Sequence, residues 1–194
     1  RESRPEATNK ESYTYGDYLT WPEEERWELI DGFPYRMSAA PSRSHQAISR
    51  ELLTQINLYL KGKTCKVYAA PFDLRLPKGD EADEEIDSVV QPDLVVVCDP
   101  QKLDERGCKG APDLVVEILS AHTAVKDMKI KRSLYEQVGV KEYWLVDPVN
   151  KIAQIYEMTG NGQYGKPQIY TEYDQVKVGI LPDLAIDLSM LFNE

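Results

Sequence analysis

The sequence predicts one domain of the α/β or α+β class, built on a mixed central β-sheet flanked by helices. Two continuous aliphatic runs, residues 94–97 and 114–116, are typical of strands buried on both faces of a sheet. Helical and strand patterns are interleaved along the chain, as expected when helices pack on such a sheet. We expect a polar tail over residues 1–12 and a single domain over residues 13–194, long enough to bury a core without disulfides or a structural metal.

The first strands are predicted to form an N-terminal β-hairpin. Asp31 and Gly32 separate two strand-like segments, residues 27–30 and 33–37, and this dipeptide suits the positive φ angles of a tight turn. Pro34 cannot donate a hydrogen bond to a neighbouring strand. The second strand of the hairpin is therefore expected at a sheet edge.

Two helices are predicted from sequence patterns. Ser44 offers an N-cap to a segment in which an apolar residue recurs every four positions, so that one helical face is apolar. The recurring residues are Ile48, Leu52, Ile56 and Leu60. A second helix is expected from about residue 123 to residue 138, with Gly139 as its C-terminal stop.

Strands are predicted for most other segments. Residues 66–69 and 72–76 have strand patterns, and the acidic, turn-rich segment 77–91 is expected to be a loop. Residues 142–147 predict another buried strand, followed by a C-terminal hairpin that turns at residues 160–162.

The composition argues against several functional classes. Acidic residues number 33 against 23 basic ones, and a net charge of −10 argues against non-specific coating of nucleic acid, although a local basic groove is compatible with it. The 3 cysteines contain no CxxC pair, so neither a zinc site nor a secreted disulfide framework is predicted. No apolar run approaches the ~20 residues of a membrane helix, and the polar N-terminus does not resemble a signal peptide. We expect no membrane partner and a cytoplasmic location.

Two carboxylates interrupt the buried strand patterns. Asp93 precedes the first aliphatic run and Glu117 ends the second, where an unpaired carboxylate is costly. If these strands are antiparallel neighbours, both carboxylates meet at one end of the sheet, and a divalent cation between them would relieve their repulsion. Asp113 stands in the same Pro-Asp-Leu-Val-Val string, but it lies roughly 13 Å from Glu117 along one strand. The alternative is that Asp93 merely follows a proline and Glu117 pairs with a helix lysine.

Several ordered blocks, from residue 13 to at least residue 148, resemble the Uma2 family. They are WELIDG (27–32), His45, APFD (70–73), QPDL (91–94), APDLVVEILS (111–120) and GVKEYWLVDP (139–148). The family in turn resembles the PD-(D/E)XK restriction-endonuclease-like superfamily. The resemblance implies the restriction-endonuclease-like fold, here with additional N- and C-terminal β-hairpins. It also implies that the protein hydrolyses phosphodiester bonds of nucleic acid with Mg²⁺ as the cofactor, for which Mn²⁺ could substitute.

The superfamily motif places an acidic residue after a proline and Glu-x-Lys on the neighbouring strand. Carried over, it implies Asp93 and Glu117 as metal ligands, but the lysine position holds Leu119. Leucine cannot orient or activate a water molecule. The ammonium group must therefore come from elsewhere in the chain or be absent.

The second predicted helix supplies candidate lysines. Lys131 stands where relatives resemble one another in carrying a basic residue, and we favour it over Lys129 and Lys126. The alternative is that these lysines form only a solvated basic helix face. A helix lysine could also contact phosphate groups.

Other positions of the resemblance suggest members of the pocket. Glu28 resembles an additional N-terminal glutamate of the superfamily and is a candidate metal ligand and catalytic residue; the alternative is a strand-edge charge. Gln91, His45, Ile118 and Lys129 are candidate pocket residues. Alternatively, Gln91 is an exposed loop residue and His45 is structural.

The sequence therefore predicts a magnesium-dependent endonuclease, with DNA the expected nucleic acid and a homodimer the expected assembly. Two alternatives come from other classes. The chain could be a catalytically inactive nuclease-fold module that binds or regulates, since Leu119 replaces the lysine. It could also be a homodimeric interaction protein that uses Tyr143, Trp144 and the C-terminal hairpin.

Overall fold

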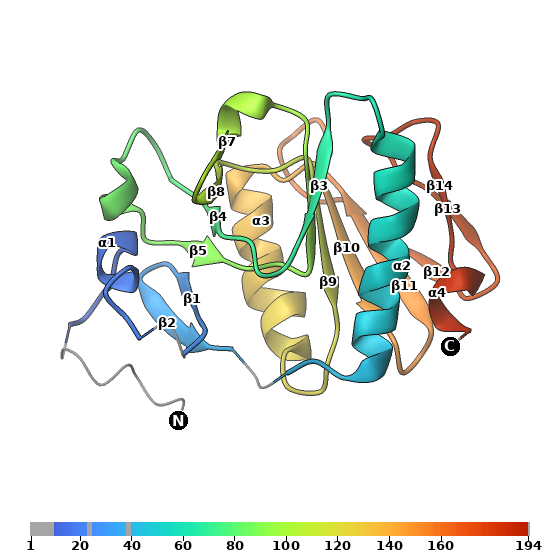
Figure 1. Cartoon of the computed structure of the whole chain (residues 1–194), viewed down its shortest axis with the longest axis horizontal. Helices are drawn as coiled ribbons and strands as arrows, with labels where there is room; N and C mark the ends of the chain where they lie inside the picture. The colour runs from blue at the N-terminus through green and yellow to red at the C-terminus, as the bar shows by residue number, and fades with distance from the viewer. Residues whose placement is uncertain (1–9, 23–24, 38–39, 194) are drawn as a thin grey trace.

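The computed structural model describes residues 10–22, 25–37 and 40–193. The predicted tail, residues 1–12, thus lies outside the described residues except for its last three. Helices and strands form stacked layers around a central sheet (Figure 1). Within the described part of the chain, no helix is long and apolar enough to cross a membrane.

The central sheet has six strands and mixed direction. From one edge to the other they are β12 (Gln168–Thr171), β11 (Ile152–Glu157), β10 (Glu142–Asp147), β9 (Leu114–Ile118), β6 (Leu94–Val97) and β3 (Lys66–Ala69). Strands β9 and β10 are parallel, and the other neighbouring pairs are antiparallel. The predicted mixed sheet with central aliphatic strands is confirmed.

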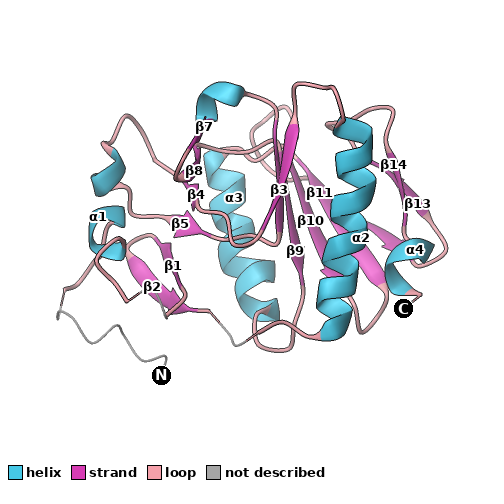
Figure 2. Ribbon diagram, viewed as in Figure 1, coloured by secondary structure: helices cyan, strands magenta, loops and turns pink. Residues whose placement is uncertain are grey.

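Helices cover both faces of this sheet (Figure 2). They are α2 (Arg43–Leu60) on one face and, on the other, the π-helical turn Lys126–Lys131 continued by α3 (Arg132–Val138). Successive strand residues point to opposite faces, so Trp144 packs in the core under α2 while its neighbour Tyr143 packs in the core under α3.

Both predicted helices exist, with corrected details. The N-cap of α2 is Ser42, whose side chain accepts the backbone N–H of His45, and not Ser44, which lies inside the helix. The second helix contains a π-helical turn that the apolar pattern could not reveal. Gly139 ends α3 in the left-handed conformation at φ 85°, as predicted.

A second six-stranded sheet packs on the α3 side of the central sheet. Its strands in order are β2 (Phe33–Arg36), β1 (Trp27–Ile30), β5 (Val89–Val90), β4 (Leu74–Arg75), β8 (Gly107–Lys109) and β7 (Leu103–Asp104). The N-terminal hairpin is confirmed, with β2 at the edge and positive φ angles at Asp31 and Gly32. The predicted loop 77–91 is wrong in part, because its last apolar residues form the buried strand β5.

Short elements complete the two ends of the fold. The helix α1 (Tyr15–Tyr18) packs near the N-terminal hairpin, and β13 (Gln175–Lys177), β14 (Ala185–Asp187) and α4 (Ser189–Phe192) lie beyond α2 (Figure 1). Strands β11 and β12 form the predicted C-terminal hairpin.

Two of the three cysteines are bonded to each other, which the sequence did not predict. Cys65 and Cys98 form a disulfide, because β3 and β6 pair with Lys66 opposite Val97 and so bring the two flanking cysteines together. The remaining cysteine, Cys108, is a buried free thiol. The pairing depends on sheet register, which cysteine spacing does not encode.

Candidate active site

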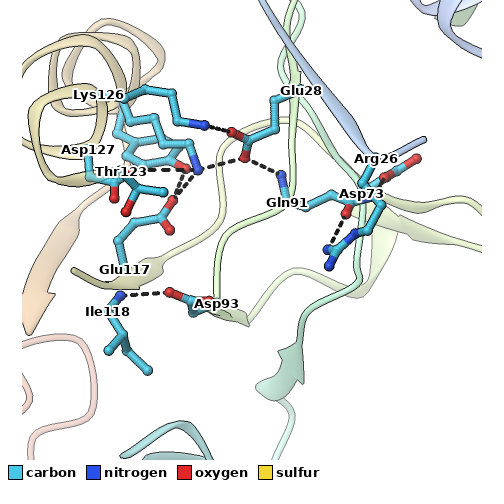
Figure 3. Close-up of polar contacts among 12 residues, drawn as sticks. Arg26, Glu28, Asp73, Gln91, Asp93, Glu117, Ile118, Thr123, Lys126 and Asp127 are labelled. Atoms are coloured by element: carbon cyan, nitrogen blue, oxygen red, sulfur yellow. Dashed lines mark hydrogen bonds and ion pairs between the residues drawn. The ribbon is translucent and has the colours of Figure 1, made fainter. Parts of the chain in front are cut away.

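The two strand carboxylates lie at the same end of the central sheet. Strands β6 and β9 are antiparallel with Leu94 opposite Val116, which confirms the predicted pairing. Asp93, just before β6, is thereby beside Glu117, and its Oδ2 accepts the backbone N–H of Ile118 at 2.7 Å (Figure 3). The sheet register therefore fixes the relative positions of these two carboxylates.

Lys131 reaches this strand end from the π-helical turn. Its Nζ lies 2.8 Å from Glu117 Oε1 and 2.6 Å from Glu28 Oε1, and its side chain is only 3% exposed. Asp127 Oδ1 lies 3.8 Å from the same ammonium group. Tyr135, one turn further along, donates its hydroxyl to Glu117 Oε1 at 2.9 Å. One buried lysine is thus shared by three carboxylates.

Glu28 links the second sheet to this cluster. It lies on β1 with a fully buried side chain, and its Oε1 also accepts the backbone N–H of Gln91 at 3.0 Å. Its Oε2 is 2.6 Å from Lys126 Nζ (Figure 3). Both oxygens of Glu28 are therefore engaged by lysines.

Polar residues extend the network outward from the centre. The Gln91 side chain accepts a hydrogen bond from Arg26 and donates one to Asp73, each at 2.8 Å (Figure 3). On the other side, His45 Nε2 lies 3.2 Å from Asp93 Oδ2. These contacts hold the side chains of Gln91 and Asp93 in place.

The buried charges shift one another's pKa values. Burial alone would raise the pKa of Glu28, but Lys131 and Lys126 outweigh burial and hold that pKa at about 2. Burial would lower the pKa of Lys131, yet the surrounding carboxylates raise it above its ordinary value. For Glu117, burial and the nearby Asp127 raise the pKa well above its usual range, against the effect of Lys131. The two lysines thus favour the charged form of Glu28, whereas burial and the neighbouring carboxylates disfavour the charged form of Glu117.

A cavity of about 880 Å³ opens over these groups. Its lining includes Glu28, His45, Gln91, Asp93, Glu117, Ile118, Lys126 and Lys131. Lys129, another candidate from the sequence, is exposed and lies outside this lining. The Ile118 side chain packs in the core, so its contribution at the strand end is its backbone.

The donor set fits a cation held by two carboxylates better than one held by three. Among the described residues, no three acidic, histidine or cysteine side chains are grouped closely enough to hold a metal ion. Glu28 has both oxygens paired with lysines, whereas Asp93 and Glu117 each keep one oxygen without a hydrogen-bond donor in the described chain. Mg²⁺ often uses only one or two protein carboxylates and fills its remaining positions with water and substrate oxygens.

Other residues lie where sequence reasoning did not place them. Tyr135 and Asp127 belong to the cluster, and only the π-helical turn and the packing of α3 bring them there. Asp113 lies at the other end of β9, where it contacts Lys141 and the backbone N–H of Cys98. Leu119, at the motif's lysine position, packs in the core under α3.

The mixed sheet, its covering helices and the acidic strand ends define an α+β fold of the restriction-endonuclease-like class. The sequence profile of the Uma2 family, described as "Putative restriction endonuclease", matches residues 15–189, and the chain belongs to this family. No curated protein matches the chain.

A solved structure has a similar fold. It is described as a putative nuclease belonging to DUF820 from Anabaena variabilis ATCC 29413, with a TM-score of 0.73 and 21% sequence identity. The match covers 93% of this chain and 97% of that chain. At this identity the likeness concerns the fold.

Proposed function

We propose that the chain is a metal-dependent endonuclease that hydrolyses phosphodiester bonds in nucleic acid. The observation that carries the proposal is the position of Lys131, whose ammonium group contacts Glu117 beside Asp93. This chain has leucine at position 119, where the superfamily motif places lysine, and Lys131 would supply the ammonium group from the helix instead. Membership of Uma2 supports a nucleic-acid substrate.

The charged residues of the site would have different roles, because their surroundings differ. Asp93 and Glu117 would hold Mg²⁺, or Mn²⁺ in its place, through the oxygens that accept no hydrogen bond. When bound, the cation would supply a Lewis acid for the phosphoryl oxygen. Lys131 would orient the attacking water and neutralise charge that develops on the phosphate. Glu28 would fix the position of Lys131, since both of its oxygens are already paired.

The test is cleavage of labelled duplex DNA, single-stranded DNA and RNA with Mg²⁺ or Mn²⁺. We expect cutting by the wild type and its loss in Asp93→Asn, Glu117→Gln and Lys131→Met. Asp113→Asn is the matched control for Asp93, because it alters the same sequence string outside the cavity. Lys129→Met is the control for Lys131, and both controls should retain cutting.

Two other results would change the assignment. Cutting that survives Lys131→Met would refute the role of this lysine. Absence of cutting on every substrate, with the cation still bound at Asp93 and Glu117, would support the inactive binding or regulatory module in place of the enzyme.

We propose DNA as the substrate and a homodimer as the active assembly, since two copies of a single small site would be needed to cut both strands. Sedimentation at equilibrium tests the assembly, and a monomer would refute both the dimer and the homodimeric interaction protein. Cytoplasmic location stays a prediction. The Cys65–Cys98 disulfide argues against a cytoplasmic location, because such bonds persist mainly in oxidising compartments.

A further inference from the structure

The π-helical turn places two lysines on one carboxylate. Lys126 and Lys131 are five residues apart, which on a regular α-helix would separate their directions by about 140°. In a π-helical turn the hydrogen bonds run from residue i to i+5, so residues five apart return to similar sides. Accordingly, each oxygen of Glu28 pairs with one of the two lysines at 2.6 Å.

The two lysines are not equivalent. Lys131 is 3% exposed and is shared with Glu117 and Asp127, whereas Lys126 is 15% exposed and forms an ion pair with Glu28 alone among the described residues. Both side chains line the cavity. An ammonium group has three N–H donors, and Glu28 accepts one of those of Lys126. Lys126 can therefore donate to a ligand without leaving Glu28.

Two basic side chains of the cavity lining, Lys126 and Arg26, are held in place by the polar network. The flexible side chain of Lys126 is held at one end by the fully buried carboxylate of Glu28, which is itself fixed by Lys131 and by the backbone N–H of Gln91. Arg26, another cation of the lining, is bonded to Gln91, which donates its backbone N–H to the same Glu28. The network thus carries positive groups to the cavity in a protein whose net charge is −10.

We propose that Lys126 is a substrate-binding residue, which donates a hydrogen bond to a phosphate oxygen next to the scissile phosphate of the bound strand, and that Glu28 is its positioning residue. This inference rests on the proposed function. It assigns to Lys126 a role in affinity that is separate from the role of Lys131 in the reaction.

The experiment measures binding of a fluorescein-labelled DNA duplex and of its single strand by fluorescence anisotropy, in EDTA and in Ca²⁺, over a range of salt concentrations. Lys126→Gln keeps a donor for Glu28 but removes the charge, and Lys126→Arg keeps the charge. Lys129→Gln is the control, because it changes an exposed lysine of the same turn outside the cavity. Thermal unfolding of each variant establishes that it is folded.

We expect Lys126→Gln to weaken binding about tenfold, as for the loss of one hydrogen bond to a charged group. The slope of log affinity against log salt should fall by about 0.9 on the duplex or about 0.7 on the single strand, which corresponds to one phosphate contact. Lys126→Arg should restore most of the affinity, and Lys129→Gln should match the wild type. In the cleavage assay, the KM of Lys126→Gln should rise by the same factor as its Kd.

The outcomes separate this inference from the proposed function. Wild type that cuts nucleic acid, with Lys126→Gln equal to Lys129→Gln in affinity and salt slope, would overturn this inference alone. Binding that depends on Lys126 without any cutting would support Lys126 as a phosphate-binding residue but would refute the hydrolysis and with it the position next to a scissile phosphate. If the wild type binds neither probe in either buffer, the inference about Lys126 is overturned.

Discussion

Replacement of Lys131 by methionine tests whether the buried ammonium group holds the site together. Methionine keeps most of the apolar length of the side chain but leaves Glu117 without its lysine, 2.8 Å away in the wild type. Breaking a buried ion pair from one side costs about 3–5 kcal/mol. Because Glu28 keeps Lys126 and Glu117 can take up a proton, we expect the lower end, about 3 kcal/mol.

The assay is urea unfolding followed by tryptophan fluorescence, because Trp21, Trp27 and Trp144 are all buried. With an m-value of about 2–3 kcal/mol/M, a loss of this size lowers the midpoint by about 1 M. Lys129→Met changes an exposed lysine of the same turn and should stay within about 0.5 kcal/mol of the wild type. Equal midpoints for the two variants would refute the argument that Lys131 neutralises buried carboxylates.

Three further predictions concern stability and covalent state. The pKa of Glu28 falls from 4.5 to about 2 on folding, so the stability that this shift contributes above pH 4.5 should be lost as the pH falls through 2. The loss should be about 3 kcal/mol in the free energy of unfolding. In equilibrium unfolding, Glu28→Gln should show a weaker dependence of stability on pH over this range. Gly107→Ala should lower the free energy of unfolding by about 2–5 kcal/mol, because φ is 113° and the new Cβ would lie 2.2 Å from Asp73 O. The control Gly162→Ala, with φ 76° and open space around the new Cβ, should cost only about 1 kcal/mol. Equal urea midpoints for the two variants would count against the clash. Thiol labelling of the denatured, unreduced protein should modify one cysteine, Cys108, and labelling of all 3 would show that the disulfide is absent.

Local sequence patterns predicted the elements that depend on local rules. The Asp31-Gly32 turn, the apolar face of α2 and the stop at Gly139 each follow from a residue type at a fixed spacing. The short strands β4, β7 and β8 have only two or three residues each, which is too few for a period to be detected. They form because neighbouring strands supply hydrogen-bond partners, and that information is tertiary.

The same distinction explains what could be predicted of the site. Asp93 and Glu117 could be paired from the sequence because two buried strands with acidic ends have few possible arrangements. Asp127 and Tyr135 could not be assigned, because their places depend on the π-helical turn and on how α3 lies over β9. The family resemblance identified Lys131, but its partners became visible only in the folded chain.

The charged cluster also joins regions that are far apart along the polypeptide. Lys126 and Glu28 are separated by 98 positions, and Lys131 bridges Glu28 on one sheet to Glu117 on the other. Neither sheet alone contains the complete set, so local opening of the N-terminal sheet would dismantle it even if the central sheet stayed intact. A nascent or truncated chain that lacks either part therefore cannot assemble the complete charged cluster.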